Sequence, residues 1–425
     1  MNIDVNYKNK KRYKTAKYPI RQPLFLTYLI SALCKVVLIG KKYKVEKINM
    51  DGLKPPYMML SNHMHFIDFK FAALGTFPYR VNNVVSIDGF YRRPWLLELI
   101  GAICTRKFTM DLHLVKSINK VLKRGDILSM YPEARYSPCG TTSYLPESLG
   151  KLVKHNKVPV VAVVHRGNHL GSPFWNYRQK RKVPYHTTMT QILTAEQVKS
   201  MSVDEINEAI RKGLAYDDYQ YQKDNGILIT EPYRAQGLHK VLYQCPHCKT
   251  ESKMNSKGAE LFCEECGKRW VWQEDGYLRA LEGETEFVHI PDWFEWERQQ
   301  VRKQVREGSY SFCEEVEVYS LPRVYRYIPL GKAKLTHDIQ NGFTLEGEYR
   351  GERYYIHRQC AQTNSLHVEY DFGPLGKRDC LDISTENDSF YCIPESSNVI
   401  TKLAFATEEL YLLQAERIEK TPATM

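Results

Sequence analysis

The sequence predicts an α/β domain, followed by a four-cysteine module and a small β-rich C-terminal domain closed by a helix. Three observations predict this fold class. Short apolar segments alternate with helical segments up to about residue 235, and two C-x-x-C pairs follow. Beyond residue 310, short alternating runs rich in Tyr, Val, Phe and Thr are separated by Asn-Gly and Arg-Gly turns. We therefore predict five parts: an apolar and basic N-terminal segment, the α/β domain, the cysteine module, a Trp-rich helical connector and the β-rich domain, at residues 1–40, 41–235, 240–272, 273–309 and 310–425.

The composition limits the class of protein. A chain of 425 residues exceeds the usual size of a single core, so several domains are expected. The mean hydropathy of −0.47 argues against a polytopic membrane protein. The net charge of +11 suits an anionic partner, either a membrane surface or a nucleic acid. Seven of the eleven cysteines are scattered, which is typical of a reduced, intracellular protein.

The N-terminal segment combines a basic stretch with an apolar run. Residues 23–40 are apolar apart from Lys35, and basic residues from Lys8 to Arg21 precede them. The run is barely long enough to cross a bilayer core of ~30 Å. The long basic lead and the lack of a small-residue cleavage site exclude a signal peptide. We expect a helix that lies on an anionic membrane surface; a helix that simply packs on the α/β domain is the alternative.

The α/β prediction depends on individual segments. We expect strands near residues 57–62, 84–88, 127–133 and 158–165, and helices near 112–125 and 147–156. Ser202 and Glu205 form a capping-box sequence, which predicts a helix over residues 202–214.

His63 and Asp68 carry the chemistry that the sequence indicates. They follow the first predicted strand and are separated by four residues. If a helix begins there, the carboxylate can hold the imidazole in one tautomer, and such an imidazole is a general base near neutral pH. It can remove a proton from an alcohol that attacks a thioester directly, with no acyl-enzyme.

Three further segments follow in a recognisable order: Gly101 to Arg106, Tyr131-Pro132-Glu133-Ala134-Arg135, and Val158-Pro159. With His63 and Asp68 they resemble the four sequence blocks of the glycerolipid acyltransferase family, typified by 1-acylglycerol-3-phosphate acyltransferases, over roughly residues 25–170. The resemblance implies a glycerolipid-acyltransferase-like catalytic domain. It implies transfer of an acyl group from acyl-CoA or acyl carrier protein to a lysophospholipid such as lysophosphatidic acid.

The resemblance also assigns roles to residues. His63 is the base and Asp68 orients it, Arg106 binds the acceptor phosphate, and Glu133 and Arg135 shape the acceptor pocket. The third block departs from the family pattern, because Ala134 replaces a glycine, Arg135 comes one place early and Tyr136 stands at the family arginine. An acceptor without phosphate is therefore an alternative. His65, between the two key residues, either tunes the base or is simply packed.

Cys245, Cys248, Cys263 and Cys266 have the spacing of a zinc ribbon. Four thiolates form a closed tetrahedral site, so we predict a structural Zn²⁺, with His247 as a bystander. Because ribbons often bind nucleic acid, a second hypothesis is a nucleic-acid-binding or scaffold protein with an inactive acyltransferase-like domain. Acidic residues interrupt the lysines around the ribbon and disfavour nucleic acid.

The remaining expectations concern location and assembly. Trp293 and Trp296 fit either a membrane-interface belt or an aromatic helix that docks on the catalytic α/β domain. Together these features predict a cytoplasmic protein held peripherally at the inner face of a membrane. No feature of the sequence indicates an oligomeric state.

Overall fold

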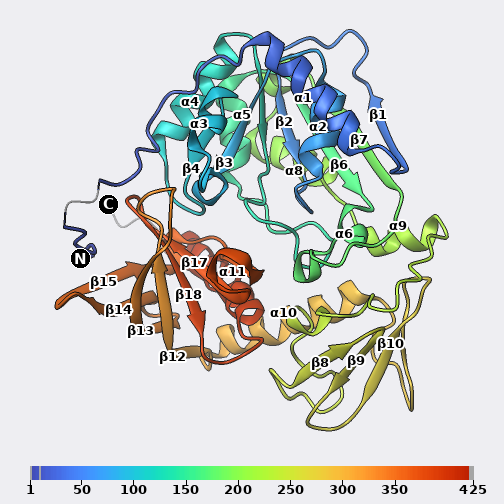
Figure 1. Cartoon of the computed structure of the whole chain (residues 1–425), viewed down its shortest axis with the longest axis vertical. Coiled ribbons are helices and arrows are strands. Elements are labelled where there is room, and N and C mark those ends of the chain that lie inside the picture. The colour runs from blue at the N-terminus through green and yellow to red at the C-terminus, as the bar shows by residue number, and fades with distance from the viewer. Residues whose placement is uncertain (1, 9–10, 421–425) are drawn as a thin grey trace. The chain divides into compact units, whose positions relative to one another are not determined.

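A computed structural model describes residues 2–8 and 11–420 and divides the chain into two compact units (Figure 1). The α/β unit comprises Lys14–Thr105 and Asp111–Glu231. The C-terminal unit comprises the residue 232–420 stretch, the short segment Arg106–Met110 and the described residues among the first thirteen. The five-part division expected from the sequence stays a prediction. Lys10 of the basic stretch lies outside the described residues.

A seven-stranded mixed sheet forms the centre of the α/β unit, in the order β1-β7-β6-β2-β5-β3-β4. Its five strands from β6 to β4 run parallel to one another, while β7 is antiparallel to β6 and parallel to β1. The strands are β1 Tyr43–Ile48, β2 Met58–Ser61, β3 Val81–Ser86, β4 Ile103–Thr105, β5 Ile127–Met130, β6 Val160–Arg166 and β7 Tyr185–Leu193.

Helices of the α/β unit are α1 Leu24–Val37, α2 Asp68–Thr76, α3 Pro94–Leu99, α4 Leu112–Lys123, α5 Ser148–Asn156, α6 Asn168–Gly171, α7 Ala195–Ser200, α8 Val203–Gly213 and α9 Asp218–Asp224. Alternate residues of β2 point to opposite faces of the sheet, as the pleat requires. Met58 and Leu60 pack with α4, α5, α7 and α8, whereas Met59 packs with Ala72 of α2. The sheet is thus covered on both faces, which explains why β2 is completely buried.

Most of the predicted elements are present, with changed ends. The expected strands correspond to β2, β3, β5 and β6, and the expected helices to α4, α5 and α8. Ser202 and Glu205 form the predicted capping box at the start of α8. β3 begins at Val81, three residues before the predicted strand, and β5 ends at Met130, before the Tyr131-Pro132-Glu133 segment.

The C-terminal unit contains two antiparallel sheets. The first has the order β11-β10-β9-β8, and its strands are β8 Met254–Lys257, β9 Glu260–Cys263, β10 Arg269–Trp272 and β11 Leu278–Ala280. Two of the four cysteines precede β8, and the other two lie at the end of β9 and in the turn after it. The second has the order β15-β14-β13-β12-β18-β17-β16. Its strands are β12 Ser311–Ser320, β13 Ile328–Asp338, β14 Gly342–Tyr349, β15 Glu352–Arg358, β16 His367–Phe372, β17 Arg378–Ser384 and β18 Ser389–Pro394.

Two helices, α10 Ile290–Glu307 and α11 Ile400–Lys420, complete this unit. They pack on each other through Phe294 and Phe405, whose ring centroids lie 4.6 Å apart. Arg298 donates to the buried carboxylate of Glu408. The β-rich region is thus followed by a C-terminal helix, as the sequence predicts, and this helix packs on α10. Trp293 is fully buried against Trp270 of the small cysteine sheet, whereas the packing alternative for the Trp-rich segment expected a contact with the α/β domain.

Among the described helices, none combines the length and the apolar character needed to cross a membrane.

Candidate active site and metal centre

The candidate active site lies where three neighbouring parallel strands end. β5, β2 and β6 are adjacent in the sheet and run in the same direction, so their carboxyl ends share one edge. His63 and Asp68 follow β2, Tyr131 to Arg135 follow β5, and the turn into α6 follows β6. This edge is where open α/β sheets usually bind ligands.

Asn62 ties the end of β2 to the end of β6. Its side-chain Nδ2 donates to the carbonyl oxygen of His165, and its Oδ1 accepts from the N–H of His165, at 3.0 and 2.8 Å. The amide thus continues the hydrogen bonding between the strands by one residue. Ser137 N–H donates to the carbonyl oxygen of His63 at 2.7 Å, which fixes the next residue of the loop.

His63 and Asp68 meet as the sequence predicts. Nδ1 of His63 lies 3.0 Å from Oδ2 of Asp68, the first residue of α2. The same oxygen accepts the main-chain N–H groups of Met64 and His65, at 2.7 and 3.0 Å. Asp68 is fully buried, whereas 21% of the His63 side chain is exposed. The carboxylate is therefore a fixed support, and the imidazole is the group that solvent or a substrate can reach.

Electrostatics favour an ionised Asp68. Burial raises its pKa, but the interactions with His165 and His63 and the hydrogen bond from Asn168 outweigh it, so the pKa lies well below the usual range. An ionised carboxylate only accepts hydrogen bonds, so Nδ1 of His63 carries the proton and Nε2 is the basic nitrogen.

Two tyrosines hold the ring of His63. The imidazole stacks on Tyr131 with a centroid distance of 3.8 Å and an angle of 20°. On Tyr136 the centroid distance is 4.2 Å. Tyr136 also contacts Phe174, at 5.1 Å. The sequence marked Tyr136 as a departure from the family arginine, but only the structure assigns it this contact.

Glu133 and Arg135 lie in the same unit as His63 and are both buried. Oε2 of Glu133 accepts the N–H of Ser143 at 3.3 Å. Burial raises the pKa of Glu133 to about 7. Burial also lowers the pKa of His65 to about 4, so this second histidine of the block is neutral at pH 7.

Arg106 belongs to the C-terminal unit. Its Nη1 and Nη2 each donate at 3.0 Å to a main-chain carbonyl oxygen, of Glu386 and Asn387 respectively. These two bonds use two of the five N–H donors of the guanidinium. The role of Arg106 in phosphate binding stays a prediction.

Asn168 is a residue of the site that the sequence analysis missed. Its Nδ2 lies 2.6 Å from Oδ1 of Asp68, one hundred positions earlier in the chain. An asparagine after a strand has no local feature that indicates this contact, since it depends on the adjacency of β2 and β6.

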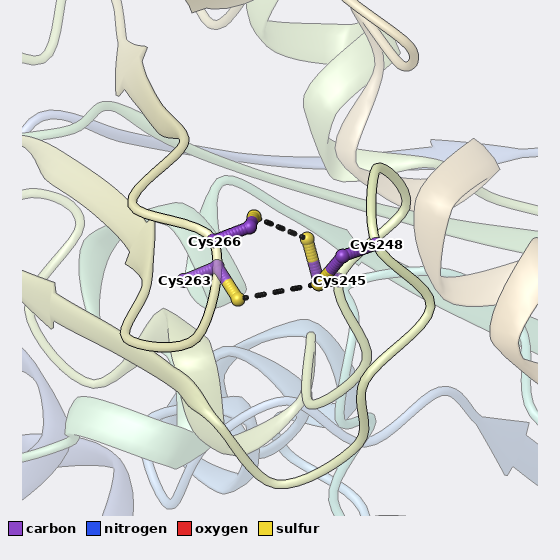
Figure 2. Close-up of side chains that lie close together, drawn as sticks. All are labelled: Cys245, Cys248, Cys263 and Cys266. Atoms are coloured by element: carbon purple, nitrogen blue, oxygen red, sulfur yellow. Dashed lines mark hydrogen bonds between the residues drawn. The ribbon is translucent and has the colours of Figure 1, made fainter.

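The four cysteines form one cluster, and Figure 2 shows their side chains pointing toward one another. Their sulfur atoms all lie within 4.8 Å of one another, with 3.8 Å between Cys245 and Cys266 and 3.7 Å between Cys248 and Cys263. A tetrahedral ion with four Zn–S bonds of ~2.3 Å requires sulfur atoms ~3.8 Å apart. The cluster therefore fits a metal ion, and the absence of disulfide bonding leaves all four thiols available.

The two C-x-x-C segments have the same backbone turn. The N–H groups of Cys245 and Cys263 each donate to the carbonyl five residues ahead, and their carbonyls each accept from the N–H four residues ahead. That fourth residue has a positive φ in both, 67° at Lys249 and 76° at Gly267. The repeated geometry presents each sulfur pair to a shared point. His247 is exposed and lies 3.4 Å from Glu286, so it is not a fifth ligand.

The cysteine cluster is connected to α10. Nε1 of Trp293 donates to the carbonyl of Gln244, and the N–H of Gln244 donates to the buried carboxyl of Glu297. Gln244 directly precedes the first ligand candidate, so a metal ion would fix the position of the helix as well as the hairpin.

Comparisons with known proteins give a distant structural likeness. No protein-family model matches the sequence, and no curated protein matches it. Among solved structures, the 1-acyl-sn-glycerophosphate (LPA) acyltransferase of Thermotoga maritima aligns with a TM-score of 0.36 and 14% sequence identity, covering 44% of this chain and 78% of that one. At this distance we base the functional proposal on the side chains described above.

We expect the purified protein to contain one metal ion per chain, measured by native mass spectrometry. Cys263→Ser should abolish binding and lower the melting temperature, because a closed four-thiolate site contributes to folding. Cys313→Ser is the control, since Cys313 is exposed and outside the cluster. Full stability of the metal-free protein would contradict a structural ion.

Proposed function

We propose that the protein is an acyltransferase that moves a fatty acyl group from an acyl thioester to the hydroxyl of a lysophospholipid-like acceptor. The observation that carries the proposal is the imidazole of His63, supported by a buried carboxylate and partly open on its other side. The four ordered sequence blocks around it support the same reaction. Acyl-CoA and acyl carrier protein are both candidate donors.

The proposed reaction uses Nε2 of His63 as the base. It removes the proton of the acceptor hydroxyl while the oxygen forms a bond to the thioester carbonyl carbon. The carbon–sulfur bond then breaks, and the leaving thiolate takes the proton back from the imidazolium. Asp68 holds the ring in the required tautomer and stabilises its positive charge, and the rings of Tyr131 and Tyr136 limit its rotation.

His63→Ala should lower kcat by about 100- to 10,000-fold with labelled acyl-CoA and lysophosphatidic acid, because general base catalysis is lost. Asp68→Asn should also lower kcat strongly, since the imidazole is no longer held in the reactive tautomer. His155→Ala is a matched control at an exposed histidine of α5. Undiminished product formation by His63→Ala would remove His63 from the mechanism.

For the acceptor, Arg135 is the better-placed of the two candidate arginines. It follows β5, the strand beside β2, and lies two positions from Glu133. Arg106 belongs to the C-terminal unit, where both of its terminal nitrogens donate to main-chain carbonyls. We propose that Arg135 meets an acceptor phosphate, which a guanidinium binds with two parallel hydrogen bonds.

Arg135→Ala should lower kcat/KM for lysophosphatidic acid by about 10- to 100-fold, but kcat/KM for monoacylglycerol, which has no phosphate, by less than about threefold. Product formation with each acceptor is compared for the wild type, Arg135→Ala and Arg106→Ala. If Arg106→Ala instead selectively lowers kcat/KM for lysophosphatidic acid, the phosphate contact belongs to Arg106. Equal use of both acceptors by the wild type would favour an acceptor without phosphate.

Helix α1 supports a second part of the proposal, contact with an anionic membrane surface. Its buried residues are Leu26, Thr27, Ser31 and Cys34, whereas its exposed side is apolar apart from Lys35. This is the reverse of a helix that faces water. The exposed apolar residues of the segment are Leu24, Phe25, Tyr28, Leu29, Leu33, Val36, Val37 and Ile39.

Two of the basic residues before α1 form ion pairs within the α/β unit. Lys17 and Arg21 form ion pairs with Glu98 and Asp126, so they also fix the segment to the α/β unit. A net charge of +11 adds attraction to anionic headgroups. We therefore propose that α1 lies in the headgroup region of the inner face of a membrane.

The double variant Phe25→Asp/Leu29→Asp should lower binding to phosphatidylglycerol-containing vesicles at least about tenfold in a flotation assay, because binding then no longer transfers these two apolar side chains from water into the membrane. Leu228→Asp is the control, since Leu228 is exposed in the same unit but outside α1. Equal flotation of the double variant and the wild type would show that α1 is not the contact.

A further inference from the structure

The two oxygens of Asp68 have different environments. Oδ2 accepts from Nδ1 of His63 and from two main-chain N–H groups of the same loop. Oδ1 accepts from Nδ2 of Asn168, at 2.6 Å. The orientation of the carboxylate plane, and with it the direction of Oδ2 toward His63, is therefore fixed from both sides.

The orientation of the Asn168 side chain is unfavourable for local stability. The residue is fully buried, and its Oδ1 has no hydrogen-bond partner among the described residues. A buried acceptor without a partner is unfavourable, and native structures contain few of them. Because an ionised carboxylate accepts only, the amide nitrogen is the atom that faces Asp68. The contact with Asp68 explains an asparagine here better than local stability does.

The turn that carries Asn168 is fixed on both of its sides. Gly167 has a φ of +80°, and a Cβ there would lie 2.3 Å from the carbonyl oxygen of Pro184. The two oxygens of Asp218 accept the N–H groups of Gly167 and His169, each at 3.1 Å. Asp218 is itself fully buried. The residues on either side of Asn168 thus have little freedom, and its side chain is held toward Asp68.

We propose that Asn168 is a positioning residue for the His63–Asp68 pair, and that Asp218 positions Asn168 through the Gly167–His169 turn. The proposal rests on the proposed function for its kinetic consequences, because Asn168 acts on the base through Asp68. The hydrogen bond from Nδ2 keeps the carboxylate ionised and aligned, so that Nδ1 of His63 stays protonated and Nε2 stays basic.

Other titratable groups around Asp68 bear on any test by pH. Burial lowers the pKa of both His65 and His165 to about 4, so both are neutral between pH 5.5 and 8.5. Tyr131 stays neutral because burial raises its pKa. Lys70, Tyr216 and Glu133 also interact with the charge of Asp68. The pKa values of Glu133 and of Asp218, which contacts the turn of Asn168, are both about 7 and lie inside the range. Each variant is therefore compared with the wild type at the same pH.

Asn168→Ala should lower kcat by about 10- to 100-fold and change KM by less than about twofold, because a hydrogen bond to the charged support is lost while the substrate contacts remain. Asn168→Asp should give a different pattern. While the introduced carboxyl is protonated it can donate to Oδ1 of Asp68, as the amide does. The ratio of its kcat to that of the wild type should therefore fall as the pH rises from 5.5 to 8.5, because two adjacent carboxylates cannot both ionise without repulsion.

The control is Asn207→Ala. Asn207 is a buried asparagine of the same unit, whose side chain bonds Gly150 and Glu147 instead of Asp68. It should leave both the kinetic constants and the pH profile unchanged. A pH-independent ratio for Asn168→Asp, or unfolding of both Asn168 variants while Asn207→Ala folds, would assign Asn168 to stability and overturn the proposal.

A measurement without substrate separates this proposal from the proposed function. The Nδ1–H proton of His63 in the NMR spectrum, assigned by its loss in His63→Ala, should shift or broaden in Asn168→Ala and stay in place in Asn207→Ala. If the wild type transfers no acyl group but this resonance responds, the function fails and the positioning role stands. If transfer is observed and neither kcat nor the resonance responds to Asn168→Ala, the positioning role is wrong.

Discussion

A carboxylate with no contact to solvent determines the arrangement of the candidate active site. An ionised group in that position is costly unless donors replace the lost water. Asp68 receives them from three sources: the imidazole of His63, the main-chain N–H groups of Met64 and His65, and the amide of Asn168. These donors come from the loop after β2 and the turn after β6. The charge of one side chain thus fixes two loops at the edge of the sheet.

The small cysteine sheet must be held together although it buries little apolar surface and brings four thiol groups close to one another. It has four short strands, and a sheet of this size has little apolar surface to bury. Trp270 and Trp272 supply part of a core, and both are fully buried. Four thiolates without a cation would repel one another, so a metal ion bound there would both neutralise them and close the hairpin. Through Gln244 the same closure would extend to α10.

Whether the sequence alone predicts a contact depends on how far apart in the chain the two residues lie. His63 and Asp68 meet within one loop, the C-x-x-C pairs within single turns, and the Ser202–Glu205 capping box within one helical turn. Local spacing determines these contacts. Asn168 reaches Asp68 only because β6 pairs with β2, and no local pattern encodes the strand order. The antiparallel β7, inserted between β1 and β6, is a tertiary feature of the same kind.

Tyr136 has a consequence for both the base and the acceptor. The family arginine at this position would place a positive charge against the imidazole, which would disfavour its protonation during the reaction. A neutral ring at 4.2 Å gives packing without that penalty. For the proposed acyl transfer, the same replacement leaves no cation at this position for an acceptor phosphate. Arg135, one residue earlier, is the nearest cation in sequence and is the one to which we assign that role. Within the proposal, Tyr136 is thus compatible with His63 as the base and requires another cation for a phosphate-bearing acceptor.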